Sequence, residues 1–389
     1  MSRLRALLRL PAAPTEVRIP DGLLEVQRDG AAPLAPRAPD GRDAPLDVAF
    51  VVPSFRTVSG GHTTIANVVR ALEARGLSCS IWILDDDARR GGGARPEALV
   101  EGFRSAFGGI AGPVHAGLDG WRGTDVLVAT AWQTVPAALR LPDVAARAYL
   151  VQDHEAEFYP TSAEREWAAW TYRQGLHCLV ASPWLEQVVA REYGASATRF
   201  DIGLDHDLYR PGGAPRRGDQ LLFYARATTA RRGVPLGILA LEELHRRRPQ
   251  VEICLFGEDR PVATGFPHRH LGVRTRPQLA ALYGQATVGV VLSLTNPSLI
   301  PHEMLACGLT CVDVASASSL AVHGPDGPVA LAALEPGALC DVVERLLDDP
   351  AERDDRRTRG IAHAAAFTWE RTGEQVEAGL REALARAAA

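Results

Sequence analysis

The chain has 389 residues, of which 46% are hydrophobic and 23% charged, and a formal net charge of −5 at pH 7. This length predicts more than one domain, and the apolar content is enough to give each domain a core. The net negative charge argues against nucleic-acid binding, and no apolar run approaches the roughly 18–20 residues that cross a bilayer. All 42 basic residues are arginine, which excludes a lysine Schiff base and a P-loop lysine.

Residues 1–45 are rich in proline, glycine and arginine, which predicts an extended or loosely attached segment. Its start, MSRLRALLRLPAAP, has too short an apolar stretch for a secretory signal and indicates at most weak association with a membrane surface. The cysteines lie mostly in apolar contexts, which is typical of reduced, buried thiols in a cytoplasmic protein. They are Cys79, Cys178, Cys254, Cys307, Cys311 and Cys340.

Buried strands alternate with helices from residue 46 onward. An apolar strand at 46–53 leads through Ser59-Gly60-Gly61-His62 into an amphipathic helix at 63–75. The other elements expected in this half are strands at 80–84, 125–130, 148–152 and 177–181, and helices at 95–107, 133–139, 164–174 and 183–193. This alternation favours a doubly wound parallel sheet.

The pattern breaks at 206–219, where proline, glycine and charge indicate a linker. The second alternation has expected strands at 220–224, 251–256, 287–292 and 310–314, and helices at 234–247, 277–285, 338–347, 351–367 and 370–388. We therefore predict an α/β protein with an N-terminal extension (1–45), a first Rossmann-like domain (46–205 with 368–389) and a second Rossmann-like domain (220–367). Ligands usually bind in clefts between such domains.

The stretch 293–314 joins two strands of the second half through a loop and a short helix. Pro297, Ser298 and Pro301 suit a loop that enters a helix, with Ser298 as its cap. Glu303 falls one turn into that helix, beside a Met-Leu-Ala-Cys run that should be buried. A carboxylate there needs a partner, which the paired hydroxyl groups of a ligand can provide. The alternative is a glutamate that caps the helix and contacts only protein.

Two arginines follow the first strand of the second half. Arg226 leaves the end of that strand, and Arg232 precedes the Gly-Val-Pro that opens the next helix. Two guanidinium groups at a helix N-terminus can clamp a diphosphate, to which the helix dipole adds. A solvated basic loop is the alternative interpretation.

Several motifs resemble those of the family-4 glycosyltransferases, in the same order along the chain. YARATTARRG resembles their diphosphate-binding segment, with Arg232 where the family usually has lysine, and SLIPHEMLACG is similar to their E-x7-E segment, with Glu303 as its second glutamate. The runs DVLVATAWQTVPAAL, HRHLGVRTRPQLAALYGQATVGVVLSL and FTWERTGEQV are similar to further family motifs, so the resemblance spans about 48–388. It implies the GT-B architecture, in which two doubly wound parallel-sheet domains face a cleft and a C-terminal helix crosses back to the first domain.

The segments YLVQDHEAEFYP and DIGLDHDLYRP resemble a bacterial subgroup, the rhamnosyltransferases of surface-glycan assembly. The resemblance implies a cytoplasmic, metal-independent and retaining hexosyltransferase. Its donor is expected to be a dTDP- or UDP-linked sugar such as dTDP-L-rhamnose, and its acceptor a hydroxyl of a glycan or small molecule, with no separate cofactor. A noncatalytic partner subunit and a nucleotide-sugar epimerase of the same fold remain as alternatives.

The resemblance also implies roles for individual residues. Arg226 and Arg232 would neutralise the diphosphate, and Glu303 would bind the ribose hydroxyls. The donor would further contact Asn296, Ser298, Leu299 and Ile300 in the loop and helix start, and the backbone of Gly272 and Val273 near the base. Gly60 and Gly61 would let the backbone of the first half approach the ligand, with a plain N-cap turn as the alternative.

Asp153, His154 and Glu155 follow a strand of the first half and face the supposed cleft. One of these three residues would bind the acceptor hydroxyl or act as its base, with Asp153 and His154 as the catalytic candidates, although a carboxylate that only caps the next turn is an open alternative. Two departures from the family matter here. Thr295 stands where the family has its first glutamate, and no histidine occurs at 130–133, where the family has its catalytic histidine.

Two patterns that suggest metal binding are set aside. Asp85-Asp86-Asp87 contains a D-x-D, which transferases of another fold use to hold a cation, but it follows a strand of the wrong topology. We interpret it as a solvated loop. His268 and His270 have no Cys or carboxylate partner at metal-ligand spacing. The sequence therefore predicts no metal site.

Overall fold

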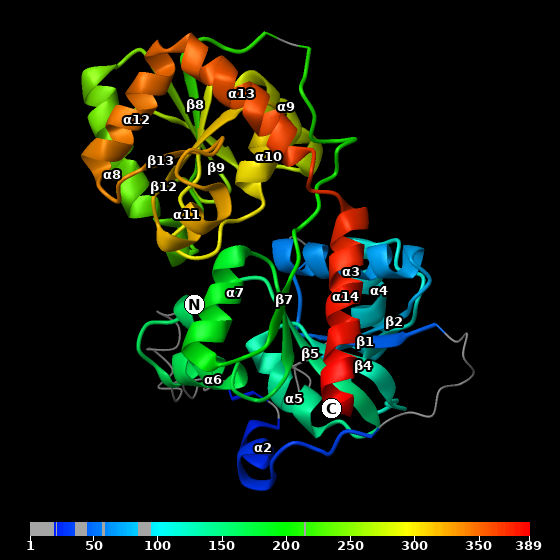
Figure 1. Ribbon diagram of the computed structural model, residues 1–389. Coiled ribbons are helices and arrows are strands. Elements are labelled where there is room, and N and C mark those ends of the chain that lie inside the picture. The colour runs from blue at the N-terminus through cyan, green and yellow to red at the C-terminus, as the bar shows by residue number, and fades with distance from the viewer. Residues whose placement is uncertain (1–18, 21, 36–44, 57–58, 85–94, 214) are drawn as a thin grey trace, which may run out of the picture.

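The computed structural model describes residues 19–389 except 21, 36–44, 57–58, 85–94 and 214. The basic N-terminal stretch and the D-x-D of Asp85–Asp87 lie outside the described residues. Two α/β domains lie one above the other in Figure 1, and the last helix, α14 (Trp369–Ala388), runs from the upper, second domain along the lower, first domain. The predicted fold class is thereby confirmed, including the helix that crosses back.

The first domain is built on a seven-stranded parallel sheet with the order β3-β2-β1-β4-β5-β6-β7. Its strands are β1 (Asp47–Val52), β2 (Ser78–Ile83), β3 (Val114–Ala116), β4 (Thr124–Ala129), β5 (Val144–Val151), β6 (His177–Val180) and β7 (Ala197–Arg199). Its helices are α3 (Gly60–Ala74), α4 (Pro96–Phe107), α5 (Val135–Arg140), α6 (Ala163–Thr171) and α7 (Pro183–Tyr193), with 3₁₀ turns η2 (Trp132–Thr134) and η3 (Glu155–Phe158). The doubly wound topology places the carboxyl ends of all seven strands at one edge.

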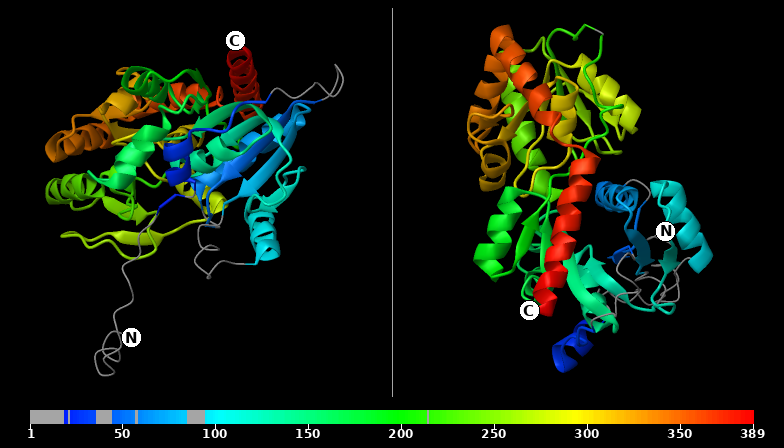
Figure 2. Two further views of the ribbon diagram at one scale, coloured as in Figure 1. Left: turned by 90° about the horizontal axis from the view of Figure 1, so that it is seen from below. Right: turned by 45° about the vertical axis from the view of Figure 1, so that its right-hand side comes forward.

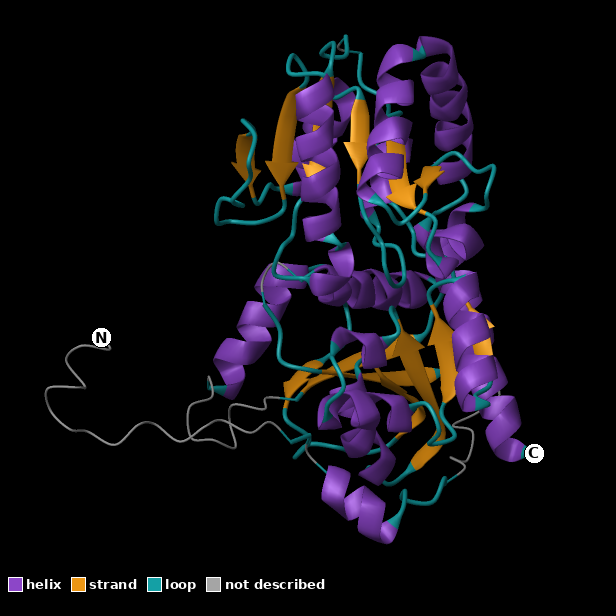
Figure 3. Ribbon diagram, turned by 90° about the vertical axis from the view of Figure 1, so that its left-hand side faces the viewer, coloured by secondary structure: helices purple, strands orange, loops and turns teal. Residues whose placement is uncertain are grey.

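The second domain repeats this plan with a six-stranded parallel sheet in the order β10-β9-β8-β11-β12-β13. Its strands are β8 (Gln220–Tyr224), β9 (Glu252–Phe256), β10 (Arg269–Gly272), β11 (Val288–Val290), β12 (Thr310–Val314) and β13 (Ala330–Ala332). Its helices are η4 (Ala230–Arg232), α8 (Val234–Arg247), α9 (Arg276–Gln285), α10 (Ile300–Ala306), α11 (Ala317–His323), α12 (Pro336–Asp348) and α13 (Pro350–Ala364). Figure 3 shows the strands of this sheet ending toward the first domain.

One element lies in a region where the sequence predicted little structure. Helix α2 (Leu23–Asp29) buries Leu23 and Val26, and it packs against α5 of the first domain. The expectation of an extended segment is therefore wrong for these seven residues. Two apolar side chains three residues apart are enough to attach a helix of about two turns, but too few to give a periodic pattern.

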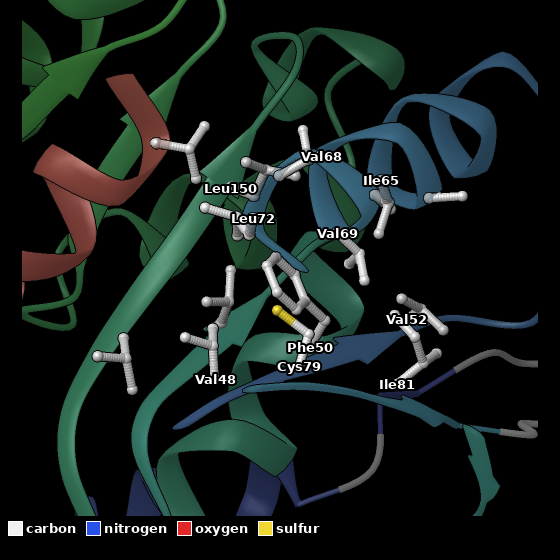
Figure 4. Close-up of a cluster of buried hydrophobic side chains, with 14 of the residues drawn as sticks. Val48, Phe50, Val52, Ile65, Val68, Val69, Leu72, Cys79, Ile81 and Leu150 are labelled. Atoms are coloured by element: carbon white, nitrogen blue, oxygen red, sulfur yellow. The ribbon is translucent and has the colours of Figure 1, made fainter. Parts of the chain in front are cut away.

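The core of the first domain explains why β1 is apolar throughout. Helix α3 presents Ile65, Val68, Val69 and Leu72 to one face of the sheet, at the spacing of a helical stripe. Figure 4 shows these side chains directed at residues of β1, β2 and β5. A second cluster, which includes Trp82, covers the opposite face of the sheet. A strand buried on both faces needs apolar residues at every position.

Helix α14 joins the second domain to the first, and Figure 2 shows it lying along the first domain in a further view. Its buried residues Val376, Leu380 and Ala383 belong to the core of the first domain. The chain crosses closely where the helix begins, because a Cβ on Gly203 would lie 2.6 Å from the Trp369 backbone nitrogen. The crossover is thus packed into the first domain along its length.

All six cysteines are buried free thiols, as the sequence predicted. Burial raises the pKa of Cys79, Cys178 and Cys307 to about 12, which keeps these thiols protonated and unreactive at neutral pH. Among the described residues, no helix combines the length and the apolar character that crossing a bilayer requires.

Candidate functional site

The two domains contact each other where α7 packs against α11, and also through segments that follow the carboxyl ends of β5 and β11. The Asp153 Oδ2 atom accepts a hydrogen bond from Thr295 Oγ1 (3.0 Å), and Asp153 Oδ1 accepts one from the Asn296 backbone N–H (3.0 Å). The Asn296 side chain returns a bond from Nδ2 to the Gln152 carbonyl (2.9 Å). Asp153, Thr295 and Asn296 are all buried. The contact therefore aligns the loop at 293–299 against the end of β5.

Two arginines of η4 complete this contact. The Arg231 Nε atom lies 3.0 Å from Asp153 Oδ2 as an ion pair, and its guanidinium stacks 4.0 Å above the Phe158 ring. The Arg232 side chain is only 7% exposed, and its Nη1 donates a long hydrogen bond to the Asn296 carbonyl (3.4 Å). Burial lowers the pKa of Arg232, but a guanidinium remains charged at neutral pH. Among the described residues, no carboxylate lies within ion-pair distance of Arg232.

A buried carboxylate shapes the loop between β11 and α10. Asp313 accepts hydrogen bonds from the Ser293 N–H (2.8 Å), the Val314 N–H (2.7 Å) and Ser319 Oγ (3.0 Å). Burial raises the pKa of Asp313 to about 7. These bonds fix the point where the loop leaves β11, so that Asn296 and Arg232 meet.

Several oxygens of the same loop have no hydrogen-bond partner among the described residues. They are Ser293 Oγ, Asn296 Oδ1 and Ser298 Oγ. Buried polar groups are nearly always paired, and exceptions in native structures call for a physical explanation. Here the three oxygens lie on a loop that also contacts the buried, positively charged Arg232, which is an arrangement that a polar ligand satisfies.

Glu303 lies in the first turn of α10, as predicted, and Met304–Cys307 beside it are buried. Burial raises the pKa of Glu303 to about 7, while the Tyr209 hydroxyl and the positive charge of Arg276 oppose that rise. The predicted cap is wrong. The helix is preceded by Leu299 in the αR conformation and has no side-chain cap, because the extended backbone that a serine cap requires is absent there.

Arg226 lies outside the interdomain contact. Its side chain is half-buried, and its Nε donates to Thr229 Oγ1 (3.3 Å) within the same turn. Nearby, at the end of β10, Gly272 adopts φ 69° and accepts a hydrogen bond from the Gly257 N–H (3.0 Å), while Val273 is 38% exposed. These residues lie after the carboxyl ends of β8 and β10, in the same domain as Arg232.

Gly60 and Gly61 form the first turn of α3, so this helix begins three residues earlier than predicted. Ser59 caps it by accepting from the His62 N–H (3.4 Å). Neither glycine has a positive φ, and a Cβ on Gly60 would meet no atom of the described residues within 4 Å. The Gly61 carbonyl accepts from Gln152 Nε2 (3.2 Å), which places the turn beside the residue that bonds Asn296. Packing against the described residues thus does not require a glycine at position 60.

His154 and Glu155 point into the first domain. The His154 Nε2 atom lies 2.6 Å from the Tyr193 hydroxyl, and Nδ1 lies 3.6 Å from Glu157. Glu155 accepts from the Trp132 N–H (2.8 Å) and the Tyr149 hydroxyl (3.0 Å), and burial raises its pKa to about 7. Of the three adjacent residues 153–155, only Asp153 directs its side chain at the second domain.

The histidine-free stretch at 130–133 is held by these inner residues. Besides the bond to Glu155, the Trp132 indole donates to the Tyr159 hydroxyl (3.1 Å), and Trp132 is buried. Within the part of the chain that the structure describes, no group of three or more His, Cys, Asp or Glu side chains is arranged to hold a metal ion. The donors that meet at the domain contact are hydroxyl, amide and guanidinium groups, which bind anions.

Two doubly wound parallel-sheet domains, with a C-terminal helix that returns to the first, define the GT-B fold. Solved structures of this fold match most of the chain. Sucrose-phosphate synthase from Thermosynechococcus elongatus superposes with a TM-score of 0.66 at 17% identity, covering 87% of this chain and 99% of that one. Anabaena Alr3699/HepE, in complex with UDP and glucose, superposes with a TM-score of 0.63 at 15% identity, covering 86% and 99%.

Sequence comparisons give named relatives. The profile of the family described as "WsaF, C-terminal domain" matches residues 219–321. The chain is 29% identical over 361 residues to the O-antigen biosynthesis protein RfbC of Myxococcus xanthus, covering 90% of this chain and 28% of that protein. It is 31% identical over 229 residues to a D-inositol 3-phosphate glycosyltransferase of Frankia alni, covering 50% and 56%. The chain thus spans between about a quarter and about half the length of these relatives.

Sequence reasoning did not single out Arg231, Asp313 or Phe158. Asp313 had a usable signal, because an acidic residue inside the apolar strand TCVDV needs buried hydrogen-bond donors. No sequence signal marked Arg231, since its partner Asp153 is distant in the chain and belongs to the other domain.

Proposed function

We propose that this protein is a glycosyltransferase that moves a sugar from a nucleoside-diphosphate donor to a hydroxyl group of an acceptor. The observation that carries the proposal is the Arg232 guanidinium, buried at the domain contact without a carboxylate within ion-pair distance in the described structure. A buried cation of this kind is satisfied by an anionic ligand. The relatives named as a glycosyltransferase and as an O-antigen biosynthesis protein support this reading.

The donor would bind mainly to the second domain. Arg232 and, from the neighbouring turn, Arg226 would neutralise the diphosphate, and the loop from Asn296 to Ile300 would add polar contacts. Glu303 would accept hydrogen bonds from the ribose hydroxyls, and the backbone at Gly272 and Val273 would contact the base. Anabaena HepE has been solved with UDP and with UDP-glucose, which supports a donor of this chemical class.

In the reaction, negative charge grows on the diphosphate as the bond to the sugar breaks. Arg232 is fixed in a buried environment, where a positive charge stabilises the leaving group more strongly than it would in water. Contact between the domains would exclude water and so limit hydrolysis of the donor. We propose retention of configuration, with the departing diphosphate taking part in deprotonating the acceptor, and we propose that no metal ion is required.

For the sugar we propose a deoxysugar such as L-rhamnose, carried by dTDP or UDP, and for the acceptor a glycan or small molecule. The support is the segment QDHEAEFYP, which supplies residues, among them Asp153 and Phe158, that contact the second domain. In this chain Asp153 and Phe158 of that segment both contact Arg231. The segment therefore lies where it would influence donor and acceptor together.

A noncatalytic binding subunit is the second candidate. It is favoured by one observation, namely that the Asp153 carboxylate is engaged by groups of the second domain and by the His154 N–H, and is not free to act as a base. The absence of histidine at 130–133 agrees with it. Such a protein would bind a nucleotide sugar or glycan without transferring the sugar.

Thermal stability in the presence of dTDP- and UDP-sugars tests the proposal, with wild type compared to Glu303→Ala. A ligand that binds the folded state raises Tm by mass action. We expect one sugar nucleotide to stabilise the wild type and not the variant, and to release its nucleoside diphosphate when acceptor glycan is added. Binding without release favours the noncatalytic candidate, and no stabilisation by any sugar nucleotide contradicts both the donor site and the proposed activity.

A further inference from the structure

The Asp153 carboxylate is an anion that comes from the first domain and is bound by donors of the second. Its two oxygens accept from the Thr295 hydroxyl and the Asn296 N–H, each at 3.0 Å, and the Arg231 guanidinium pairs with it at 3.0 Å. From the first domain, the His154 N–H also donates to Asp153 Oδ1 (2.9 Å). A hydroxyl, a backbone amide and an arginine are the groups that proteins use to hold phosphate oxygens. The set of donors therefore has the composition of a phosphate site that is filled by a carboxylate of the same chain.

The charges at this contact favour a ligand with more negative charge than one carboxylate. Arg231 and Arg232 are adjacent in sequence, and both positive charges act near Asp153, while only Arg231 is within ion-pair distance of it. The buried oxygen Asn296 Oδ1, on the same residue that bonds Asp153, has no partner among the described residues. One carboxylate thus leaves both a positive charge and a polar atom unsatisfied, whereas a diphosphate with sugar hydroxyl groups satisfies both.

We propose that Asp153 takes the position of a phosphate group of the donor in the ligand-free protein. On this view Arg231 and the Thr295 hydroxyl are further ligands of the diphosphate, which they bind together with the Asn296 amide after Asp153 has withdrawn. This inference rests on the proposed donor site, but it adds residues to that site and assigns Asp153 a role in which its carboxylate competes with the donor phosphate.

The contact also links donor binding to the arrangement of the domains. While Asp153 holds Thr295 and Asn296, the Asn296 side chain bonds the Gln152 carbonyl, and Gln152 in turn bonds Gly61. Withdrawal of Asp153 breaks its own bonds to the second domain and leaves the groups that made them free to bind the phosphates of the sugar donor. The same withdrawal frees the carboxylate to meet an acceptor hydroxyl, which it cannot do while its oxygens are engaged.

Calorimetric titration with inorganic pyrophosphate and with UDP and dTDP tests the proposal on the full chain. Asp153→Asn removes the competing charge and the ion pair with Arg231, so we expect it to bind pyrophosphate about tenfold more tightly than wild type. Glu166→Gln is the matched control, because it removes one negative charge from the exposed surface of the same domain. It should change the affinity less than twofold.

A second variant tests the assigned ligand directly. Arg231→Gln should weaken pyrophosphate binding about tenfold or more, even though it also removes the partner of Asp153. Arg246→Gln, an exposed arginine of α8 that pairs with Glu243, is its control and should bind as wild type does. Unchanged binding in Arg231→Gln would mean that this arginine only joins the domains, and it would overturn the assignment.

The outcomes separate this inference from the proposed function. If Asp153→Asn binds pyrophosphate and the nucleotides more weakly than wild type, Asp153 supports the anion site rather than filling it, and the inference fails while the donor site stands. If pyrophosphate binding tightens in Asp153→Asn but neither nucleotide binds, the inference stands and the nucleotide donor fails. If pyrophosphate binds to neither protein, the inference fails outright.

Discussion

Replacing Arg232 by methionine should move stability and ligand binding in opposite directions. In the ligand-free protein the guanidinium is 7% exposed, with one long hydrogen bond of 3.4 Å and no carboxylate within ion-pair distance in the described structure. Its burial is therefore poorly compensated. Methionine has a similar length and no charge, so it keeps the packing and removes the cost of burying the charge.

The expected gain is about 1–3 kcal/mol for removing an incompletely satisfied polar group, which corresponds to a rise in Tm of at least about 2 °C in domains of this size. The expected loss is that of a hydrogen bond to a charged group, about 1.5–3 kcal/mol, or roughly a 10- to 150-fold higher Kd for UDP or dTDP. Differential scanning fluorimetry and calorimetric titration measure the two effects on the same preparations. Arg246→Met, on the exposed side of α8, is the control and should change neither quantity appreciably.

Measuring both Tm and nucleotide affinity distinguishes a ligand-binding arginine from a structural one. A structural arginine would lower Tm when it is replaced and leave nucleotide binding as it was. If Arg232→Met is less stable than wild type and binds nucleotides equally well, the argument from an unsatisfied buried charge is refuted, and with it the main support for the donor site.

Three further results are expected. The pKa of Glu303 is raised to about 7, so its carboxylate becomes ionised as the pH rises through neutrality. Nucleotide affinity should therefore increase between about pH 6 and 8 in wild type and stay constant in Glu303→Gln. Parallel pH profiles of affinity in the two proteins would show that the carboxylate does not bind the nucleotide. Burial lowers the pKa of His302, His323 and His363, to about 4 for His323, so the unfolded chain binds protons first and stability falls below about pH 6.5. At pH 5 the loss from His323 is about 2 kcal/mol, and His323→Leu should flatten the acid side of a Tm–pH curve; an unaltered slope would contradict it. Sugar transfer should persist in excess EDTA, and its complete loss would return attention to Asp85–Asp87.

The sequence predicted the fold where hydrophobic periodicity was strong. Every central strand and every long helix was placed within a few residues, because strands covered on both faces are apolar runs and helices carry one apolar stripe. The strands that it missed are β3, β7, β10 and β13, which form the four edges of the two sheets. They are three or four residues long, and an edge strand pairs on one side only, so no apolar run marks it.

The candidate site was predictable in its local parts only. Glu303 one turn into a buried helix and Arg232 before a helix start were read from neighbouring residues. The contacts of Asp153 were not, because they join it to Thr295 and Asn296, more than a hundred residues away in the other domain. Hydrophobic patterns fix which residues enter a core, whereas the pairing of polar side chains between domains depends on how two finished sheets meet.

The segment QDHEAEFYP contributes residues both to the contact between the domains and to the interior of the first domain. Its residues fall into two pairs. Asp153 and Phe158 contact Arg231 of the second domain, whereas Glu155 and Tyr159 accept hydrogen bonds from Trp132 of the first domain. The inward pair gives the outward pair a rigid base, and a carboxylate on a rigid base can be replaced by a ligand without disturbing the domain that carries it. A purely catalytic motif would not need the contacts of Asp153 and Phe158 with Arg231. The arrangement therefore favours a segment that controls access of ligands to the anion site.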